Sequence, residues 1–219
     1  FHTLLSLFRS YYSLDMRNFL LILSSFAFNT SADLKVYLDQ ELKTLMPKVI
    51  EWRHDIHEHP ELGNREFRTS NKVKTHLESL GIKVESGIAY TGVVGLIEGG
   101  KPGPTIALRA DMDALPVEEK TGLPFASKVR TKYLGNDVGV MHACGHDAHV
   151  AILMGVAEFL AKNKSELKGN VMLIFQPAEE GGGGGLAMIE DGLFQKFPMD
   201  SVWGMHNWPG MNEGSVAVH

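Results

Sequence analysis

Val171-Met-Leu-Ile-Phe175, followed at once by Gln176-Pro-Ala-Glu-Glu180, is the stretch that decides the fold of this 219-residue chain. An unbroken apolar run of this length is typical of a strand that is buried on both faces. Val93–Ile97 and Thr105–Ala110 predict two further strands, and Ser201–Met205 predicts a short one. Helical patterns separate these runs, so the sequence predicts an α/β fold with a layered sheet.

Four segments predict helices. Leu34–Ile56 has apolar residues at helical spacing and is expected to be interrupted near Pro47. Phe67–Leu80 precedes Gly81, a residue that favours the end of a helix. Ala148–Ala161 is the strongest pattern, with Asp147 as its expected N-terminal cap. The remaining predictions are a short helix and a turn: Leu186–Asp191 and Gly99–Pro104.

Polar side chains follow three of the predicted strands. Asp111 and Asp113 come after the strand Thr105–Ala110. Glu179 and Glu180 come after Val171–Phe175, and His206 comes after Ser201–Met205. In open α/β sheets, active sites collect at the carboxyl ends of the strands. The sequence therefore predicts that these segments meet at one edge of the sheet.

A fourth polar cluster, His142-Ala-Cys-Gly-His-Asp-Ala-His149, precedes the strongest helix. Cys144 and His146 are two residues apart, so both can face one ion in an extended loop. A thiolate and an imidazole suit zinc, and also manganese, cobalt or nickel when carboxylates join them. The alternative is a helix N-terminus with incidental polar residues. We do not assign His142 or His149 as ligands.

Glu179 and Glu180 are adjacent, so their side chains diverge and are expected to do different jobs. One can bind metal while the other holds water and moves its proton. The alternative is a solvated loop. The glycines 181–185 let the backbone approach a site closely, and they lack the Lys-Ser/Thr ending of a phosphate loop.

Three further groups of residues leave alternatives open. Asp111 and Asp113 either orient imidazoles, bind metal or form a capped turn. His206 is either a structural histidine or a ligand, and it joins the expected ligands because a metal site needs more than two or three ligands from this chain. A histidine cluster is expected to pack a helix end against the sheet rather than to contact substrate: His54, His57 and His59.

Composition narrows the class of protein. Apolar residues make up 44% of the chain, which allows a sizeable core. The formal charge is −5 and there is no basic stripe, so nucleic acid is not the expected partner. Cys144 is the single cysteine, so no internal disulfide can form.

The N-terminal region resembles a secretory signal that starts at Met16 and ends at Ala32. Met16-Arg-Asn18 supplies a positive charge, Phe19–Phe28 is apolar, and small residues follow. We therefore expect residues 1–32 to be upstream sequence and signal, and residues 33–219 to be part of a catalytic domain. The alternative is a buried or interfacial helix, because the run is too short to span a bilayer. Both a cytoplasmic and an exported location stay open.

The motifs, in order, resemble the aminoacylase/carboxypeptidase metallopeptidases of family M20. The similarity is greatest to the amidohydrolase branch that includes hippurate hydrolase, N-acetyldiaminopimelate deacetylase and auxin-conjugate hydrolases, and it runs from about Leu34 to His219. The strings that carry it are His54–Leu62, Arg109–Pro116, Thr121–Phe125, Met141–His149, Gln176–Glu180 and Gly204–His206.

The resemblance implies a three-layer α/β sandwich with a mostly parallel sheet, like that of zinc peptidases. It implies that Cys144, His146, Glu180 and His206 are metal ligands, with Cys144 able to bridge two ions, and that Glu179 is the general base. The family also has a smaller lid and dimerisation domain and a last histidine ligand near its C-terminus. This chain stops before both, so we expect residues 1–219 alone to be inactive and any homodimer to form through the missing domain.

The predicted activity is hydrolysis of the amide bond of a small N-acyl amino acid, with one or two ions of zinc or manganese, or else cobalt or nickel. Two rivals remain. One is a thiol amidase that uses Cys144 as nucleophile. The other is a non-catalytic metal-binding pseudoenzyme.

Overall fold

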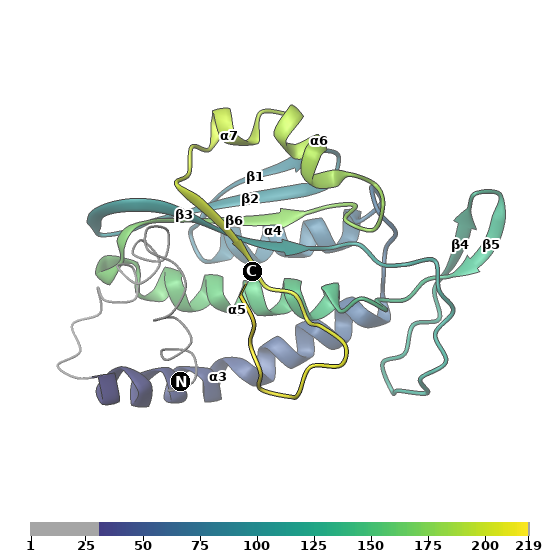
Figure 1. Ribbon diagram of the computed structural model, residues 1–219, viewed down its shortest axis with the longest axis horizontal. Coiled ribbons are helices and arrows are strands. Elements are labelled where there is room, and N and C mark those ends of the chain that lie inside the picture. Colours follow the sequence, from purple (N-terminus) through teal and green to yellow (C-terminus); the bar gives the residue numbers. More distant parts are fainter. Residues whose placement is uncertain (1–30, 219) are drawn as a thin grey trace.

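The computed structural model describes residues 31–218, in which helices cover both faces of a five-stranded sheet. The signal predicted at Met16–Ala32 lies almost wholly outside the described residues. One face carries three helices, α3 (Ser31–Glu58), α4 (Phe67–Ser79) and α5 (His146–Lys162), and the other carries α6 (Gly184–Glu190) and α7 (Leu193–Lys196) (Figure 1). The predicted three-layer α/β architecture is confirmed.

The strands lie in the spatial order β1 (Lys83–Ile88), β2 (Gly92–Glu98), β6 (Lys168–Gln176), β3 (Lys101–Asp111) and β7 (Ser201–Gly204). β2 is antiparallel to β1 and β6, whereas β3 is parallel to β6 and β7. Every strand except β2 therefore runs in one direction, so the sheet is mostly parallel.

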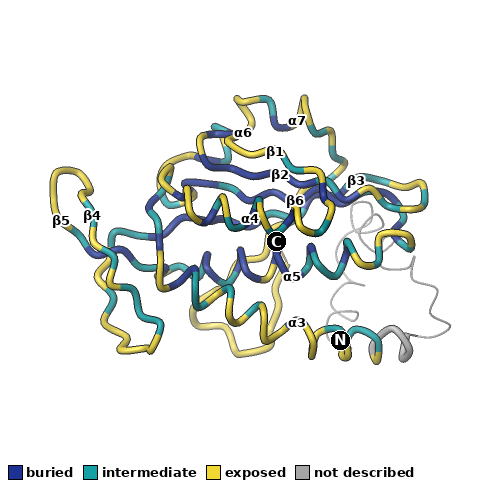
Figure 2. The backbone as a smooth tube through the Cα atoms, turned by 180° about the vertical axis from the view of Figure 1, so that it is seen from behind, coloured by how far each residue is buried: buried dark blue, intermediate teal, exposed yellow. Residues whose placement is uncertain are grey.

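The alternation of side chains along β6 divides the core into two. Val171, Leu173 and Phe175 point into the larger cluster, beneath α4 and α5. Met172 and Ile174 point into a smaller cluster with residues of α6 and α7. Successive strand residues face opposite sides, so an apolar run is needed wherever both sides are covered. The buried strands form the centre of the molecule in Figure 2.

Helix α3 continues through Pro47, so the predicted interruption is wrong. Figure 1 shows the helix changing direction along its length, as a proline within a helix causes. Both halves are tied to α5: Glu41 pairs with Lys162 at 2.7 Å and Arg53 pairs with Asp147 at 3.1 Å. Helix α5 therefore contacts α3 on both sides of the proline.

Other local predictions also need correction. Asp147 lies within the first turn of α5, and Gly145, with φ 87°, occupies the cap position. Strand β3 begins at Lys101, inside the segment predicted as a turn. Leu42 and Ile50 of α3 are exposed, whereas Leu45 is buried.

Several short elements carried too weak a pattern to predict. They are β1, α7, the 3-10 turn Lys164–Glu166 and the hairpin of β4 (Arg130–Tyr133) and β5 (Asn136–Gly139). The hairpin projects from the body of the molecule (Figure 1). Among residues 31–218, no helix has the length and apolarity that crossing a membrane requires.

Candidate metal centre

The three parallel strands β6, β3 and β7 end at the same edge of the sheet. Asp111 pairs with Gln176 in the β3–β6 register, and Arg109 pairs with Gly204 in the β3–β7 register. The polar segments that follow these strands therefore leave the sheet side by side. The N-terminus of α5 faces the same edge, and the expected polar segments come together there.

The turn before α5 depends on glycine at position 145. Gly145 has φ 87°, a conformation that residues with a side chain rarely adopt. A Cβ atom there would also collide with the side-chain amide of Asn207, the residue after His206. Gly145 thus allows the loop with Cys144 to approach the loop with His206 closely, and the Cys144 Sγ atom lies 3.6 Å from His206 Nε2.

His146 is fully buried, and its ring is held in one orientation. Nδ1 lies 2.8 Å from the backbone oxygen of Asp113, and because a carbonyl only accepts, Nδ1 carries the proton and donates it. Nε2 is left with a free electron pair. It lies 3.8 Å from Glu179 Oε2 and 4.0 Å from Glu180 Oε1.

Two buried atoms at this point have no hydrogen-bond partner within the described part of the chain: His146 Nε2 and Glu180 Oε1. Cys144, His146 and Glu180 each offer one ligand atom, and these three atoms lie within 4.8 Å of one another. Leaving buried polar atoms unpaired is costly, and a bound cation would satisfy both. The sulfur, nitrogen and oxygen donors therefore fit a divalent transition metal.

The charges around Cys144 favour a cation as well. Burial raises the pKa of the Cys144 thiol to about 11, and the carboxylates of Glu180, Glu179 and Asp111 add to this. A group of acids around a thiol is an electrostatic environment that a divalent ion would neutralise. Without a cation, the same charges oppose formation of a thiolate nucleophile.

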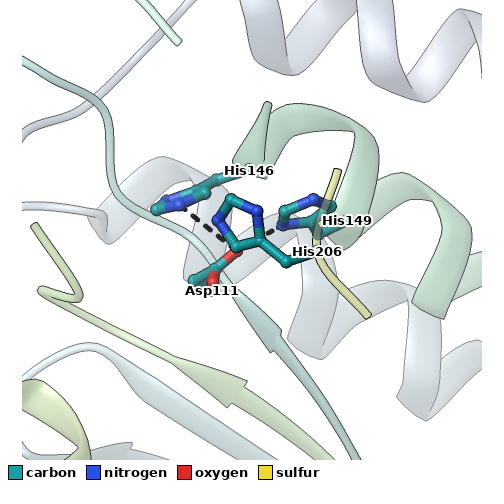
Figure 3. Close-up of side chains that lie close together, drawn as sticks. All are labelled: Asp111, His146, His149 and His206. Atoms are coloured by element: carbon teal, nitrogen blue, oxygen red, sulfur yellow. Dashed lines mark hydrogen bonds and ion pairs between the residues drawn. The ribbon is translucent and has the colours of Figure 1, made fainter. Parts of the chain in front are cut away.

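A second group of possible ligands lies beside the first: Asp111, His146, His149 and His206 (Figure 3). Here Asp111 and His149 already bind each other, with His149 Nδ1 2.6 Å from Asp111 Oδ1. The other ring nitrogen of His149 accepts the backbone N–H of Asn207 at 3.2 Å. Both nitrogens of His149 are therefore engaged, which favours a role in holding the His206 loop over direct ligation.

Arg109 extends this chain of contacts behind the site. Its guanidinium contacts Asp111 Oδ2 at 2.5 Å and Gln176 Oε1 at 3.0 Å. Burial opposes ionisation of Asp111, but His149, Arg109 and His146 together lower its pKa to about 2. The resulting carboxylate fixes the proton of His149 on Nδ1 and leaves Nε2 to accept from the loop of His206.

Asp113 holds the glutamate pair through its side chain. Its Oδ1 and Oδ2 accept the backbone N–H groups of Glu179 and Glu180, each at 2.9 Å. Its carbonyl also accepts the proton of His146, as described above. Asp113 therefore connects the loop after β6 to the start of α5. Of the three roles considered for it from the sequence, this contact with His146 fits the orientation of an imidazole.

The five residues singled out from the sequence occupy one region of the structure. His146 is buried, Cys144 is partly buried, and the Glu180 and Glu179 side chains are 22% and 40% exposed. His206 is exposed. One fully buried acid near these five residues, Glu66, was not predicted from the sequence. It lies in a loop with charged neighbours, a composition typical of a solvent-exposed loop.

The histidines before Pro60 lie elsewhere. His57 is buried between Asp147 on α5 and Glu119, at 3.0 and 3.1 Å. His54 stacks on Phe125 with ring centroids 3.7 Å apart. The end of α3 thus packs on α5 and on the loop after β3.

The chain is similar to proteins of one peptidase family. A family model described as peptidase family M20/M25/M40 matches residues 107–219. Thermostable carboxypeptidase 1 of Saccharolobus solfataricus is 50% identical over 177 residues, which cover 80% of this chain and 42% of that protein. Hippurate hydrolase of Campylobacter jejuni is 50% identical over 157 residues, which cover 72% of this chain and 38% of that protein.

Among solved structures, the chain resembles the YXEP protein of Bacillus subtilis, described as a dinuclear metal-binding peptidase from the M20 family. The TM-score is 0.68 and the identity is 44%, over 77% of this chain and 44% of that one. The chain therefore spans less than half the length of these relatives.

Proposed function

The chain belongs to the peptidase family M20/M25/M40, and on that premise we propose that the whole protein hydrolyses the amide bond of an N-acyl amino acid with the help of one or two divalent ions. Hippurate is benzoylglycine, an N-acyl amino acid, and a carboxypeptidase likewise cleaves an amide next to a terminal carboxylate. The names of both relatives therefore describe a substrate in which the amide bond lies next to the carboxylate of an amino acid.

The observation that carries the proposal is a pair of buried atoms, His146 Nε2 and Glu180 Oε1, which lie near the Cys144 sulfur and have no hydrogen-bond partner among the described residues. We propose these three residues and His206 as the metal ligands, with zinc or manganese as the preferred ion. A divalent ion bound there would supply Lewis acidity that polarises an acyl carbonyl and acidifies water.

Glu179 is the proposed general base. Its side chain is partly exposed, and its Oε2 lies close to the proposed ligand His146. A carboxylate in this position can take a proton from the attacking water and later deliver it to the departing amine. The amide bond breaks as that nitrogen is protonated, giving a carboxylic acid and a free amino acid.

The test is to assay the whole protein, the natural polypeptide that contains this sequence, against N-acetyl and N-benzoyl amino acids. We expect turnover that is lost on chelation and restored by manganese or zinc. Turnover that survives complete metal removal, but is lost in Cys144→Ser, would instead establish the thiol amidase. Metal binding without turnover of any N-acyl amino acid would establish a non-catalytic protein.

A further inference from the structure

Glu66 is a buried acid that the proposed reaction does not use. It lies at the residue before α4, its side chain is 0% exposed, and it makes no capping hydrogen bond to that helix. Burial raises its pKa, against the opposing effect of its hydrogen bonds. A buried carboxyl group is costly to keep, so its contacts should explain its presence.

The two carboxylate oxygens of Glu66 join segments that are far apart in the sequence. Oε2 accepts the hydroxyl of Thr91 at 2.6 Å, and Oε1 accepts the backbone N–H of Ala178 at 2.8 Å. Thr91 and Ala178 are themselves buried. One side chain therefore links the turn before β2 to the turn after β6.

Both of these turns contain strained backbone. Ala178 has φ 48°, and Tyr90, next to Thr91, has φ 75°. Residues other than glycine persist in this region only when surrounding contacts hold them there. The hydrogen bond from Ala178 to Glu66 is such a contact, and it acts directly on the strained peptide.

Ala178 is also the residue that directs the glutamate pair. Its N–H and the next two N–H groups, of Glu179 and Glu180, are accepted in succession by Glu66 and then by the two oxygens of Asp113. Asp113 alone fixes the last two amides. The direction in which the chain leaves β6 is fixed one residue earlier, at Ala178.

We infer that Glu66 is a positioning residue, whose carboxylate holds the strained turn at Ala178 so that Glu179 and Glu180 face the candidate metal centre. The inference rests on the proposed function for the roles of the two glutamates. The geometry it explains, three successive amides held by two buried carboxyl groups, belongs to the structure itself.

The experiment compares variants of the whole protein for Mn²⁺ affinity, for kcat and KM on an N-acyl amino acid, and for unfolding temperature. Glu66→Met fills a similar volume but accepts no hydrogen bond. Glu66→Gln keeps an oxygen for the Ala178 N–H, and the Thr91 hydroxyl can turn to accept from the new amide. Val73→Ala is the matched control, since it removes buried volume from α4, the helix that follows Glu66, without touching the turn.

We expect Glu66→Met to weaken Mn²⁺ binding by about 10-fold or more, in the range seen when a group that orients ligands is lost. Its kcat at saturating Mn²⁺ should fall by a similar factor while KM changes little. Glu66→Gln should stay close to the wild type in both Mn²⁺ affinity and kcat. Val73→Ala should lower only the unfolding temperature.

If Glu66→Met lowers the unfolding temperature but leaves Mn²⁺ affinity and kcat unchanged, as Val73→Ala should, Glu66 is merely structural and the inference is wrong. Should Glu66→Met fail to fold, Glu66→Asp replaces it, because the shorter side chain cannot reach both donors; unchanged Mn²⁺ affinity there would also refute the inference. A wild type that binds Mn²⁺ but turns over no N-acyl amino acid would refute the proposed function alone, and the affinity comparison would still decide the role of Glu66.

Discussion

At the scale of single residues, the site depends on which atoms are already engaged. His149 has both ring nitrogens in hydrogen bonds, whereas His146 has one nitrogen fixed by the Asp113 carbonyl and the other without a hydrogen-bond partner among the described residues. Proximity alone would make both residues ligands. Because a nitrogen that accepts a hydrogen bond has no electron pair left for a metal, the two histidines have different proposed roles.

The two adjacent glutamates should separate when each is changed to glutamine. Glu179→Gln should keep bound metal but lose most turnover, on the order of 100-fold or more, because an amide cannot accept the proton. Glu180→Gln should weaken metal binding first. Metal content and kcat of both purified variants decide this, with Glu190→Gln on the exposed side of α6 as control. Loss of metal in Glu179→Gln alone would reverse the two assignments.

His57 should make stability depend on pH. Its hydrogen bond to Asp147 chiefly, helped by that to Glu119, raises its pKa above the ordinary 6.5 despite burial. The folded state therefore holds the proton more tightly than the unfolded state. This stabilisation is fully present below pH 6.5 and is lost as the pH rises through the raised pKa of the folded state.

Urea unfolding at a series of pH values from 6 upward measures this effect. We expect His57→Gln to lose the component of stability that declines with rising pH, and His59→Gln, whose side chain is 47% exposed, to retain it. An identical pH dependence in wild type and His57→Gln would show that the ion pairs of His57 do not contribute to it.

At the scale of elements, the N-terminus of α5 determines whether the two halves of the site can meet. Gly145→Ala would force a side chain into the left-handed region and into Asn207. We expect a loss of about 2 kcal/mol or more in the free energy of unfolding, together with weaker metal binding. Gly122→Ala is the control, because Gly122 also has positive φ but open space around it.

Gly122→Ala should lower the free energy of unfolding by only about 1 kcal/mol and leave metal affinity unchanged. Chemical denaturation and metal titration of both variants provide the comparison. Equal effects of the two substitutions on metal affinity would contradict the view that Gly145 serves the close approach of the two loops.

The elements that the sequence predicted are those with strong patterns. The run Val171–Phe175 has the composition of a strand covered on both faces, and β6 is the buried centre of the sheet. β1 contains Lys83, Glu85 and Gly87 and is mostly exposed, so no apolar pattern marks it. Local pattern also could not show that α3 passes through Pro47, because a proline favours a helix break in sequence and the contacts of α3 with α5 come from residues distant in the chain.

The same distinction applies to the site. Possible metal ligands that lie close together in the chain, such as Cys144 and His146, can be recognised from the sequence alone. Glu66 could not be predicted, since its partners Thr91 and Ala178 lie 25 and 112 residues away in the chain. Whether a charged residue in a loop is solvated or buried is decided by tertiary contacts alone.

At the scale of the whole molecule, the architecture explains why distant segments form one site. Three parallel strands deliver their loops to one edge, and α5 begins at the same edge. The boundary at residue 32 and a homodimer of the whole protein stay predictions.

We propose that Cys144, His146, Glu180 and His206 together hold a metal ion. Anomalous diffraction from crystals of the whole protein grown with zinc or manganese tests it most directly. We predict a strong anomalous peak at about 2.0–2.3 Å from His146 Nε2 and the Cys144 sulfur. A peak bound by Asp111 and His149 with no sulfur contact, or no peak at this edge of the sheet, would show that these four residues do not form the metal site.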